Sequence, residues 1–105
     1  MESIRLSPDY FCYPLWWNSG DRVGDIDPAT LPLSQALIYD LLAWADDFDA
    51  VYNEADPAES GFRSIKAVEQ FDAEGVRLWK QLQEELASSY HVVYKRMKDG
   101  VIVDS

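Results

Sequence analysis

Few residues of this 105-residue chain have the types and spacing that catalysis or metal binding requires. Cys12 is its single cysteine and His91 its single histidine. The two cannot supply a typical four-ligand zinc site by themselves. A nucleophilic pair of Cys12 and His91 is a minor alternative, because a free cysteine in an apolar segment usually behaves as a small buried hydrophobe. We expect no catalytic residue, no metal and no cofactor, and a structural or surface role for the histidine.

Carboxylates offer the other candidate chemistry. Asp46 and Asp49 are three residues apart, a spacing that places both on one side of a helix. Neither a companion histidine nor a glycine-rich phosphate loop supports a catalytic role for them. Asp25 and Asp27 lie in a segment without the spaced ligands and the closing glutamate of a calcium-binding loop. The sequence therefore predicts a protein that is not an enzyme.

The acidic residues are unevenly distributed along the chain. The formal net charge is −10, and residues 23–62 contain nine carboxylates but neither lysine nor arginine. Like charges at this density repel one another unless cations or a basic partner neutralise them. Two interpretations stay open, namely a solvated surface that aids solubility and a surface that meets a basic protein partner. The candidate partner-binding acids are Asp46, Asp47, Asp49, Glu54 and Asp56, with Asp25 and Asp27 as secondary candidates.

The charge balance also bears on which partners and compartments suit the chain. A strongly acidic protein is a poor ligand for nucleic acid or an anionic membrane, since both interactions depend on basic patches. No apolar run approaches the ~20 residues of a membrane span, and the N-terminus lacks the features of a signal peptide. A single cysteine excludes an internal disulfide, which suits a reducing compartment. With 48% hydrophobic residues, we expect one folded cytoplasmic domain over residues 1–105, with no oligomeric state favoured.

Two amphipathic helices should form the body of this domain. The first is predicted over residues 33–56 and the second over residues 65–86, each with one apolar stripe. A glycine, Gly75, interrupts the stripe of the second helix at a cost of about 1 kcal/mol relative to alanine. Such a glycine often allows another element to approach closely. We expect that element to be the first helix, near Ala45 or Trp44.

The N-terminal segment, residues 3–17, is predicted to be extended, and its run at residues 10–13 is dense in strand-forming side chains. Trp16 and Trp17 close the segment. At least one of them is expected to complete the core beneath the helices, since buried aromatic side chains dominate core energetics. In the alternative, Trp16 is an exposed anchor for a partner, because tryptophan is enriched at binding hot spots. Breaker residues then predict a loop over residues 18–32.

A strand is predicted over residues 90–97, with a two-residue hairpin turn at residues 99–100 and a return strand over residues 101–103. In this register Lys95 faces Asp104. The expected fold class is α+β: a small two-layer domain in which two long amphipathic helices pack on an antiparallel sheet of about three to four strands.

Several strings in the chain carry a family resemblance. They are CYPLWW at residues 12–17, IDPATLPLS at 26–34 and WADDFD at 44–49, followed by shorter matches at 56–57 and 60–62. Together they resemble a family of small acidic bacterial proteins that are similar to the immunity proteins of toxin–immunity gene clusters. The resemblance covers about residues 10–86 and brings no catalytic residue with it.

The resemblance implies an immunity protein that binds and neutralises a cognate toxin, such as a nuclease or another toxin with a basic cleft. In this hypothesis the aspartates mimic phosphate and steer a fast encounter, while neighbouring aromatic side chains supply binding energy. The alternative is a non-enzymatic interaction or regulatory module. Such a module would use the aromatic edge at Trp16 or the C-terminal strand for pairing. Replacing the acids by amides, and Trp16 separately, discriminates between the two.

Overall fold

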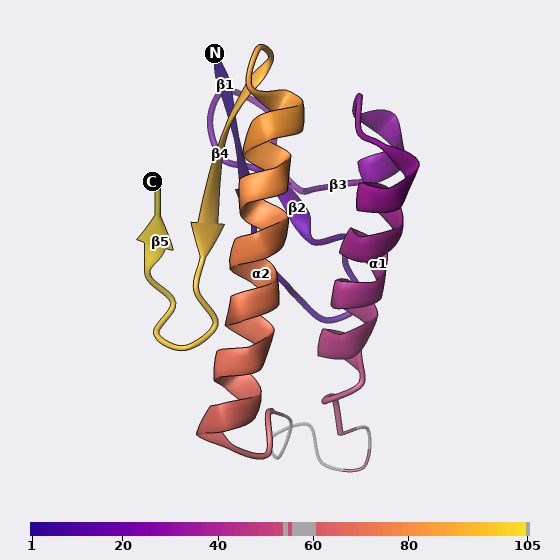
Figure 1. Ribbon diagram of the computed structural model, residues 1–105, viewed down its shortest axis with the longest axis vertical. Coiled ribbons are helices and arrows are strands. Elements are labelled where there is room, and N and C mark those ends of the chain that lie inside the picture. The colour runs from indigo at the N-terminus through magenta and orange to yellow at the C-terminus, as the bar shows by residue number, and fades with distance from the viewer. Residues whose placement is uncertain (54, 56–60, 105) are drawn as a thin grey trace.

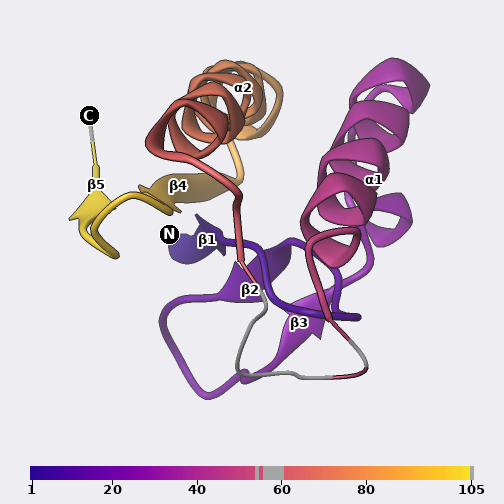
Figure 2. The ribbon, with the colours of Figure 1, turned by 90° about the horizontal axis from the view of Figure 1, so that it is seen from below.

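The computed structural model describes residues 1–53, 55 and 61–104. Both helices lie on the same face of a single sheet (Figure 1, Figure 2), so the predicted α+β class is confirmed. Within the described part of the chain, no helix is long and apolar enough to cross a membrane. The elements, in chain order, are β1 (Glu2–Leu6), β2 (Leu15–Trp17), β3 (Asp25–Ile26), the 3-10 turn η1 (Pro28–Thr30), α1 (Gln35–Asp49), α2 (Ile65–Leu86), β4 (Tyr90–Lys95) and β5 (Ile102–Val103).

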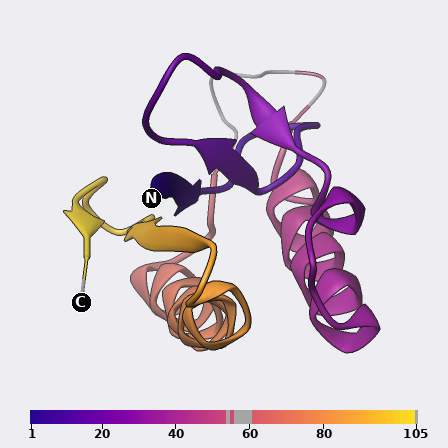
Figure 3. The same cartoon turned by 90° about the horizontal axis from the view of Figure 1, so that it is seen from above.

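The five strands form one sheet in the order β3-β2-β1-β4-β5. The sheet is larger than expected because β3, a two-residue edge strand paired with β2, forms within the predicted loop of residues 18–32. The return strand predicted at residues 101–103 is present as the opposite edge strand, β5. The sheet is mixed rather than antiparallel, since β1 and β4 are parallel and Ile4 lies beside Val92. A parallel pair requires a long crossover connection. Here that connection contains α1 and α2, which places both helices over the sheet (Figure 3).

α1 begins where predicted and ends earlier. The Ser34 side chain caps it by accepting a hydrogen bond from the Leu37 N–H group at 3.2 Å. The helix stops at Asp49 rather than continuing to residue 56. Carboxylates are unfavourable at the negative end of a helix, and the β-branched and aromatic residues that follow are weaker helix formers. The predicted helical positions of Glu54 and Asp56 lie outside the described residues.

Glu85 of α2 holds the first turn of α1. Its carboxylate accepts hydrogen bonds from the Ser34 N–H group at 2.6 Å and from the Ser34 hydroxyl at 2.9 Å. Burial opposes ionisation of Glu85, but the hydrogen bonds from Ser34 and Gln81 outweigh it and lower the pKa of this carboxyl. The two helices are thereby joined through a group whose stabilising form is the anion.

We expect Glu85→Ala to reduce the free energy of unfolding by about 1–2 kcal/mol at pH 7, because charged hydrogen bonds of this kind are lost. The lowered pKa of Glu85 determines the pH range in which this residue stabilises the fold. The contribution is present above the unfolded pKa of about 4.3 and disappears as the pH falls through the folded-state pKa. Denaturant unfolding at pH 7 and pH 2.5 measures the free energy of unfolding of the variant and of the parent. The exposed neighbour Glu84, changed to alanine, serves as the control. A Glu85 effect of the same size at both pH values would contradict this role.

The core tryptophans come from the helices. Trp44 is 2% exposed, donates a hydrogen bond from its indole N–H to the Phe71 carbonyl at 3.1 Å and stacks on the Phe71 ring at 4.4 Å. Trp79 is 5% exposed. Of the β2 pair, Trp17 packs against the core while still half-buried, and Trp16 is half-buried outside it. The core closure expected from β2 is therefore only partial.

Gly75 allows the close approach that its position in the helix predicts. A Cβ atom on this residue would lie 2.7 Å from Tyr94 Cζ and 3.0 Å from Trp44 Cζ2. The expected neighbour on α1 is confirmed, and the nearer neighbour is a tyrosine of β4. The Tyr94 hydroxyl donates to Asp72 on α2, and burial is the main cause that raises the pKa of the phenol. One glycine thus makes room for both elements at the centre of the core.

The strand predicted at residues 10–13 is wrong. The Asp9 carbonyl accepts a hydrogen bond from the Cys12 N–H group at 3.3 Å, and the Asp9 carboxylate accepts one from the Tyr10 N–H group at 2.8 Å. These contacts form a turn, in which Phe11 has a φ of 60°. Cys12 is therefore half-buried in a loop rather than buried in a strand.

The predicted register of the C-terminal hairpin is also wrong. Lys95 pairs with Ile102 rather than Asp104. Asp72 of α2 accounts for the difference, since its carboxylate accepts hydrogen bonds from the N–H groups of residues 97 and 98 at 2.8 and 2.9 Å. These bonds hold the chain against α2 and replace the two-residue turn by a wider loop.

Candidate functional site

The acidic residues of α1 lie on its outer side, because its apolar stripe is buried against α2 and the sheet. Asp46 and Asp47 are exposed, and Asp49 is half-buried. Adjacent residues of a helix are 100° apart, so Asp46 and Asp47 lie on different flanks. α1 therefore presents its carboxylates to hollows on two separate flanks.

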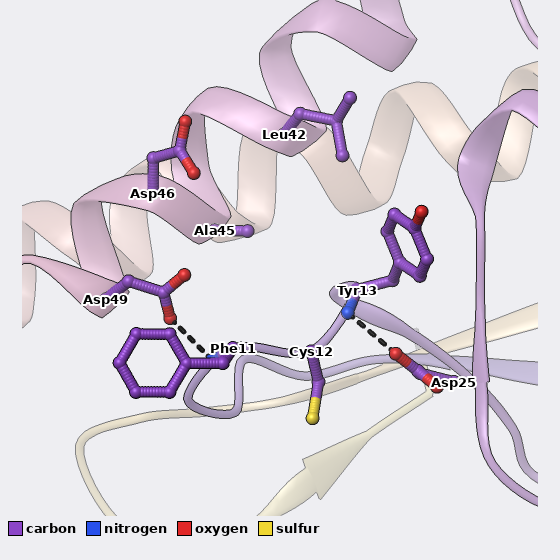
Figure 4. Close-up of a pocket in the computed structure, with 8 residues that line it drawn as sticks. All are labelled: Phe11, Cys12, Tyr13, Asp25, Leu42, Ala45, Asp46 and Asp49. Carbon is purple, nitrogen blue, oxygen red and sulfur yellow. Dashed lines mark hydrogen bonds between the residues drawn. The ribbon is translucent and has the colours of Figure 1, made fainter.

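One hollow lies between α1 and the loop of residues 11–13, and we call it the α1 groove (Figure 4). Its volume is about 440 Å³. Asp46 and Asp49 stand at one end and Asp25 at the other, with apolar side chains of α1 between them. The lining residues are Phe11, Cys12, Tyr13, Asp25, Leu42, Ala45, Asp46 and Asp49.

Two of these carboxylates position the loop. Asp49 accepts a hydrogen bond from the Phe11 N–H group at 2.9 Å, and Asp25 accepts one from the Tyr13 N–H group at 2.8 Å. In each carboxylate one oxygen is used, and no described residue bonds the other. The Asp46 carboxylate forms neither a hydrogen bond nor an ion pair with any residue that the structure describes. The groove thus combines fixed carboxylates with free acceptor oxygens.

The loop displays an aromatic side chain to solvent. Phe11 is 69% exposed, and its φ of 60° is a conformation that bulky residues seldom adopt. Its ring meets Tyr52 edge-on at 5.3 Å, and beneath it Tyr10 stacks on Phe48 at 4.5 Å. Tyr13, at the other end of the groove, is 41% exposed.

A functional role for these two groove aromatics was not predicted from the sequence. The available signal was Asp9, a residue type that favours turns by bonding nearby backbone N–H groups. Such a turn directs the aromatic run that follows it away from a strand ladder.

In the hollow on the other flank of α1, more of the negative charge is neutralised by a cation. This hollow lies between α1 and α2, has a volume of about 340 Å³ and contains Asp40, Asp47 and Glu74. Arg77 bridges two of these acids, at 3.1 Å from Asp40 and in a short contact with Glu74. The Glu74 hydrogen bond, followed by that of Asp40, raises the pKa of the Arg77 guanidinium. Asp47 is the acid of this flank that no described cation pairs.

The comparisons with known proteins assign the chain to a family. The sequence model of a family described as Serratia CdiI immunity protein-like matches residues 2–97. The chain belongs to this family. The match runs from β1 through β4, so it is wider than the resemblance over residues 10–86, and it ends before β5. No curated protein matches the chain. Membership in the CdiI immunity protein-like family indicates toxin neutralisation as the general function.

The predicted partner-binding residues of this CdiI-like protein are not all in one place. Asp27 caps η1 by accepting from the Ala29 N–H group at 2.9 Å, and its charge is the main cause that raises the pKa of Tyr13. It therefore lies near the Asp25 end of the α1 groove. Glu54 and Asp56 belong to the part of the chain that the structure does not describe.

Trp16 lies away from the acidic residues of α1. The β1–β2 register pairs it with Arg5, between Ile4 and Leu6, whose side chains are fully buried on the helix side of the sheet. Trp16 therefore faces the opposite side. Its indole N–H donates to the Ser7 carbonyl at 2.8 Å, and the Arg5 guanidinium lies 5.9 Å from its ring. Trp16 does not line the α1 groove, although its cross-strand partner on β3 is Asp25, which stands at one end of that groove.

Cys12 and His91 do not form a reactive pair. The Cys12 thiol donates to the Tyr10 carbonyl at 3.4 Å. Burial, together with the charges of Asp9, Asp25 and Asp49, raises the pKa of this thiol and so disfavours the nucleophilic thiolate.

His91 of β4 contacts Asp104 beyond β5. Among the described residues, no three side chains of histidine, cysteine, aspartate or glutamate are placed to hold a metal ion.

Proposed function

We propose that this CdiI-like protein neutralises a cognate bacterial toxin in the cytoplasm by covering a basic surface of the toxin with the acidic face of α1. We define this acidic face as Asp25, Asp46, Asp47 and Asp49. The protein acts by occupying its partner and performs no chemistry of its own. Glu54 and Asp56 follow α1 in the sequence and are included in the proposal on that ground alone.

The supporting observation is the absence of cations from the acidic face. No lysine or arginine in the described part of the chain pairs with any of the four carboxylates, whereas Asp40 on the same helix is paired with Arg77. Unpaired like charges on one surface destabilise a folded protein by mutual repulsion. A basic partner relieves this repulsion when it binds, and it gains attraction at long range before contact.

A nuclease is the toxin class that this surface suits best. A nuclease binds a polyanion, so its substrate cleft is lined by basic side chains. Carboxylates spaced along a helix can occupy such a cleft in place of phosphates. Inhibition then requires only that the acidic face and the nucleic acid compete for the same cations.

The test measures capture of the product of the neighbouring toxin gene. The variant Asp46→Asn/Asp47→Asn/Asp49→Asn should lose most of its affinity and its ability to protect cells that express the toxin. A matched control removes three exposed acids elsewhere, in the variant Asp21→Asn/Glu69→Gln/Glu84→Gln, and should retain both. The triple variant and its control have the same net charge, so a change in overall charge cannot explain a difference between the two.

The same assay tests the alternative, in which an aromatic edge at Trp16 pairs with a partner. Trp16→Ala is expected to leave capture and protection nearly unchanged, because Trp16 is half-buried and does not line the α1 groove. Loss of capture in Trp16→Ala, with full capture by the triple amide variant, would reject the acidic face and favour the interaction-module reading.

A further inference from the structure

The α1 groove has features that a general acidic surface lacks. Its middle is apolar, since Leu42 and Ala45 line it between the carboxylates at its two ends. Phe11 projects from its rim with 69% of its surface exposed. The groove therefore offers an apolar wall, an aromatic ring and free carboxylate oxygens within one concavity.

The exposed Phe11 ring is held in place by a strained backbone conformation. A bulky residue with a φ of 60° is strained, and Phe11 keeps this conformation while its N–H group donates to Asp49. Tyr52 supports the ring from one side at 5.3 Å. Large apolar side chains exposed beside polar groups are typical of protein contact sites.

Resting on the proposed function, we infer that the α1 groove binds an arginine side chain of the toxin. The methylene stem of the arginine lies along Leu42 and Ala45. Its guanidinium stacks on Phe11 and bonds the free oxygens of Asp46 and Asp49. Charge complementarity selects a cation for this groove, and the pairing of aromatic ring with carboxylates selects arginine over lysine.

The preference for arginine follows from its shape. A guanidinium is planar, so it can stack on a ring and donate to two carboxylate oxygens at the same time. A lysine ammonium is a compact, strongly hydrated charge that cannot do both in this geometry. Citrulline has the shape of arginine without its charge, and it separates the electrostatic contribution from the contribution of shape.

Nuclear magnetic resonance titration of the full chain with three capped peptides tests the inference. The peptides are acetyl-Gly-Arg-Gly-amide and its lysine and citrulline analogues, added up to about 50 mM. The arginine peptide should shift the backbone amide signals of Phe11, Tyr13, Ala45 and Asp46. The lysine peptide should bind at least about threefold more weakly, and the citrulline peptide should leave these signals unchanged.

Two variants connect this binding to the groove. Phe11→Gly removes the ring and accepts the positive φ, so folding is not at risk, and it should weaken binding of the arginine peptide about two- to fivefold. Asp46→Asn should weaken it by a similar factor. The controls are Asp47→Asn on the other flank and Tyr39→Ala, which removes a ring that is 74% exposed on α1 outside the groove. Both controls should bind as the parent does.

The outcomes separate this inference from the proposed function. Absence of shifts in the groove, equal binding of arginine and lysine, or insensitivity to Phe11→Gly overturns the arginine site while toxin capture through the acidic face stands. If toxin capture survives the triple amide variant, the proposed function fails whatever the peptides do. Groove shifts that are specific to arginine, with binding weakened in both variants, support the inference.

Discussion

Reversing the charge of Asp46 should weaken binding of the cognate toxin by about 2–5 kcal/mol, the range measured when one partner of a desolvated charge pair is removed. The fold should tolerate Asp46→Lys because the Asp46 side chain is exposed and forms no bond with a described residue. Asp47→Lys should cost less than half as much, since Arg77 already supplies positive charge to that flank. Calorimetric titration of toxin with each variant gives the two free energies.

Glu69→Lys, an equal change of charge on an exposed site of α2, controls for the altered net charge. It should reduce affinity by no more than about 0.5 kcal/mol, because exposed charges distant from an interface are screened. If Asp47→Lys binds more weakly than Asp46→Lys, the toxin contacts the flank between α1 and α2 instead. Equal losses in Asp46→Lys and Glu69→Lys would remove any special role for α1.

Gly75→Ala should lower the free energy of unfolding by about 2–3 kcal/mol. Overpacking of a core costs about 1–3 kcal/mol, and displacing the buried Tyr94 hydroxyl from Asp72 adds a further loss. The gain in helix propensity, about 1 kcal/mol, offsets only part of this. Tyr94 is fully buried and Trp44 is 2% exposed, so neither ring can turn aside into solvent. Urea unfolding followed by tryptophan fluorescence measures the change.

The double variant Gly75→Ala/Tyr94→Phe identifies the contact responsible. Removing the hydroxyl takes away the atom nearest to the added Cβ, so the two substitutions together should cost less than the sum of their separate effects. Ala73→Gly, at an exposed position of the same helix, isolates the propensity effect at about 1 kcal/mol. If Gly75→Ala were stabilising, propensity would outweigh packing, and the proposed crowding at this glycine would be wrong.

The elements with long, regular patterns were predictable from sequence. The stripe of α2 gave both of its ends, Ile65 and Leu86, and Ser34 marked the start of α1. Gly75 predicted a close neighbour and Trp44 is one of the two. These features depend on local spacing, which the sequence contains in full.

Features decided by contacts between distant residues were not predictable in the same way. The strand-like run at residues 10–13 is a turn because Asp9 bonds it locally and Asp49, distant in sequence, bonds the Phe11 N–H group. The hairpin register changes because Asp72 of α2 holds residues 97 and 98. A strand propensity carries no information about such side-chain contacts from another element.

The same limit applies to the candidate site. The excess of acids between residues 23 and 62 was visible in the sequence, but their division into two flanks was not. Asp25 joins Asp46 and Asp49 across the α1 groove only because β3 pairs with β2 at the sheet edge. Arg77 neutralises Asp40 from another helix, a pairing that a count of charges along the chain does not reveal.

The dependence of toxin association on ionic strength tests the central claim most directly. If the acidic face of α1 steers the encounter, the association rate constant of the parent should fall at least about tenfold between 50 and 500 mM salt. The dissociation rate constant should change far less, and the triple amide variant should associate slowly with little dependence on salt. A parent association rate that does not respond to salt, or an equal response in the amide variant, would contradict the claim that these carboxylates meet a basic partner.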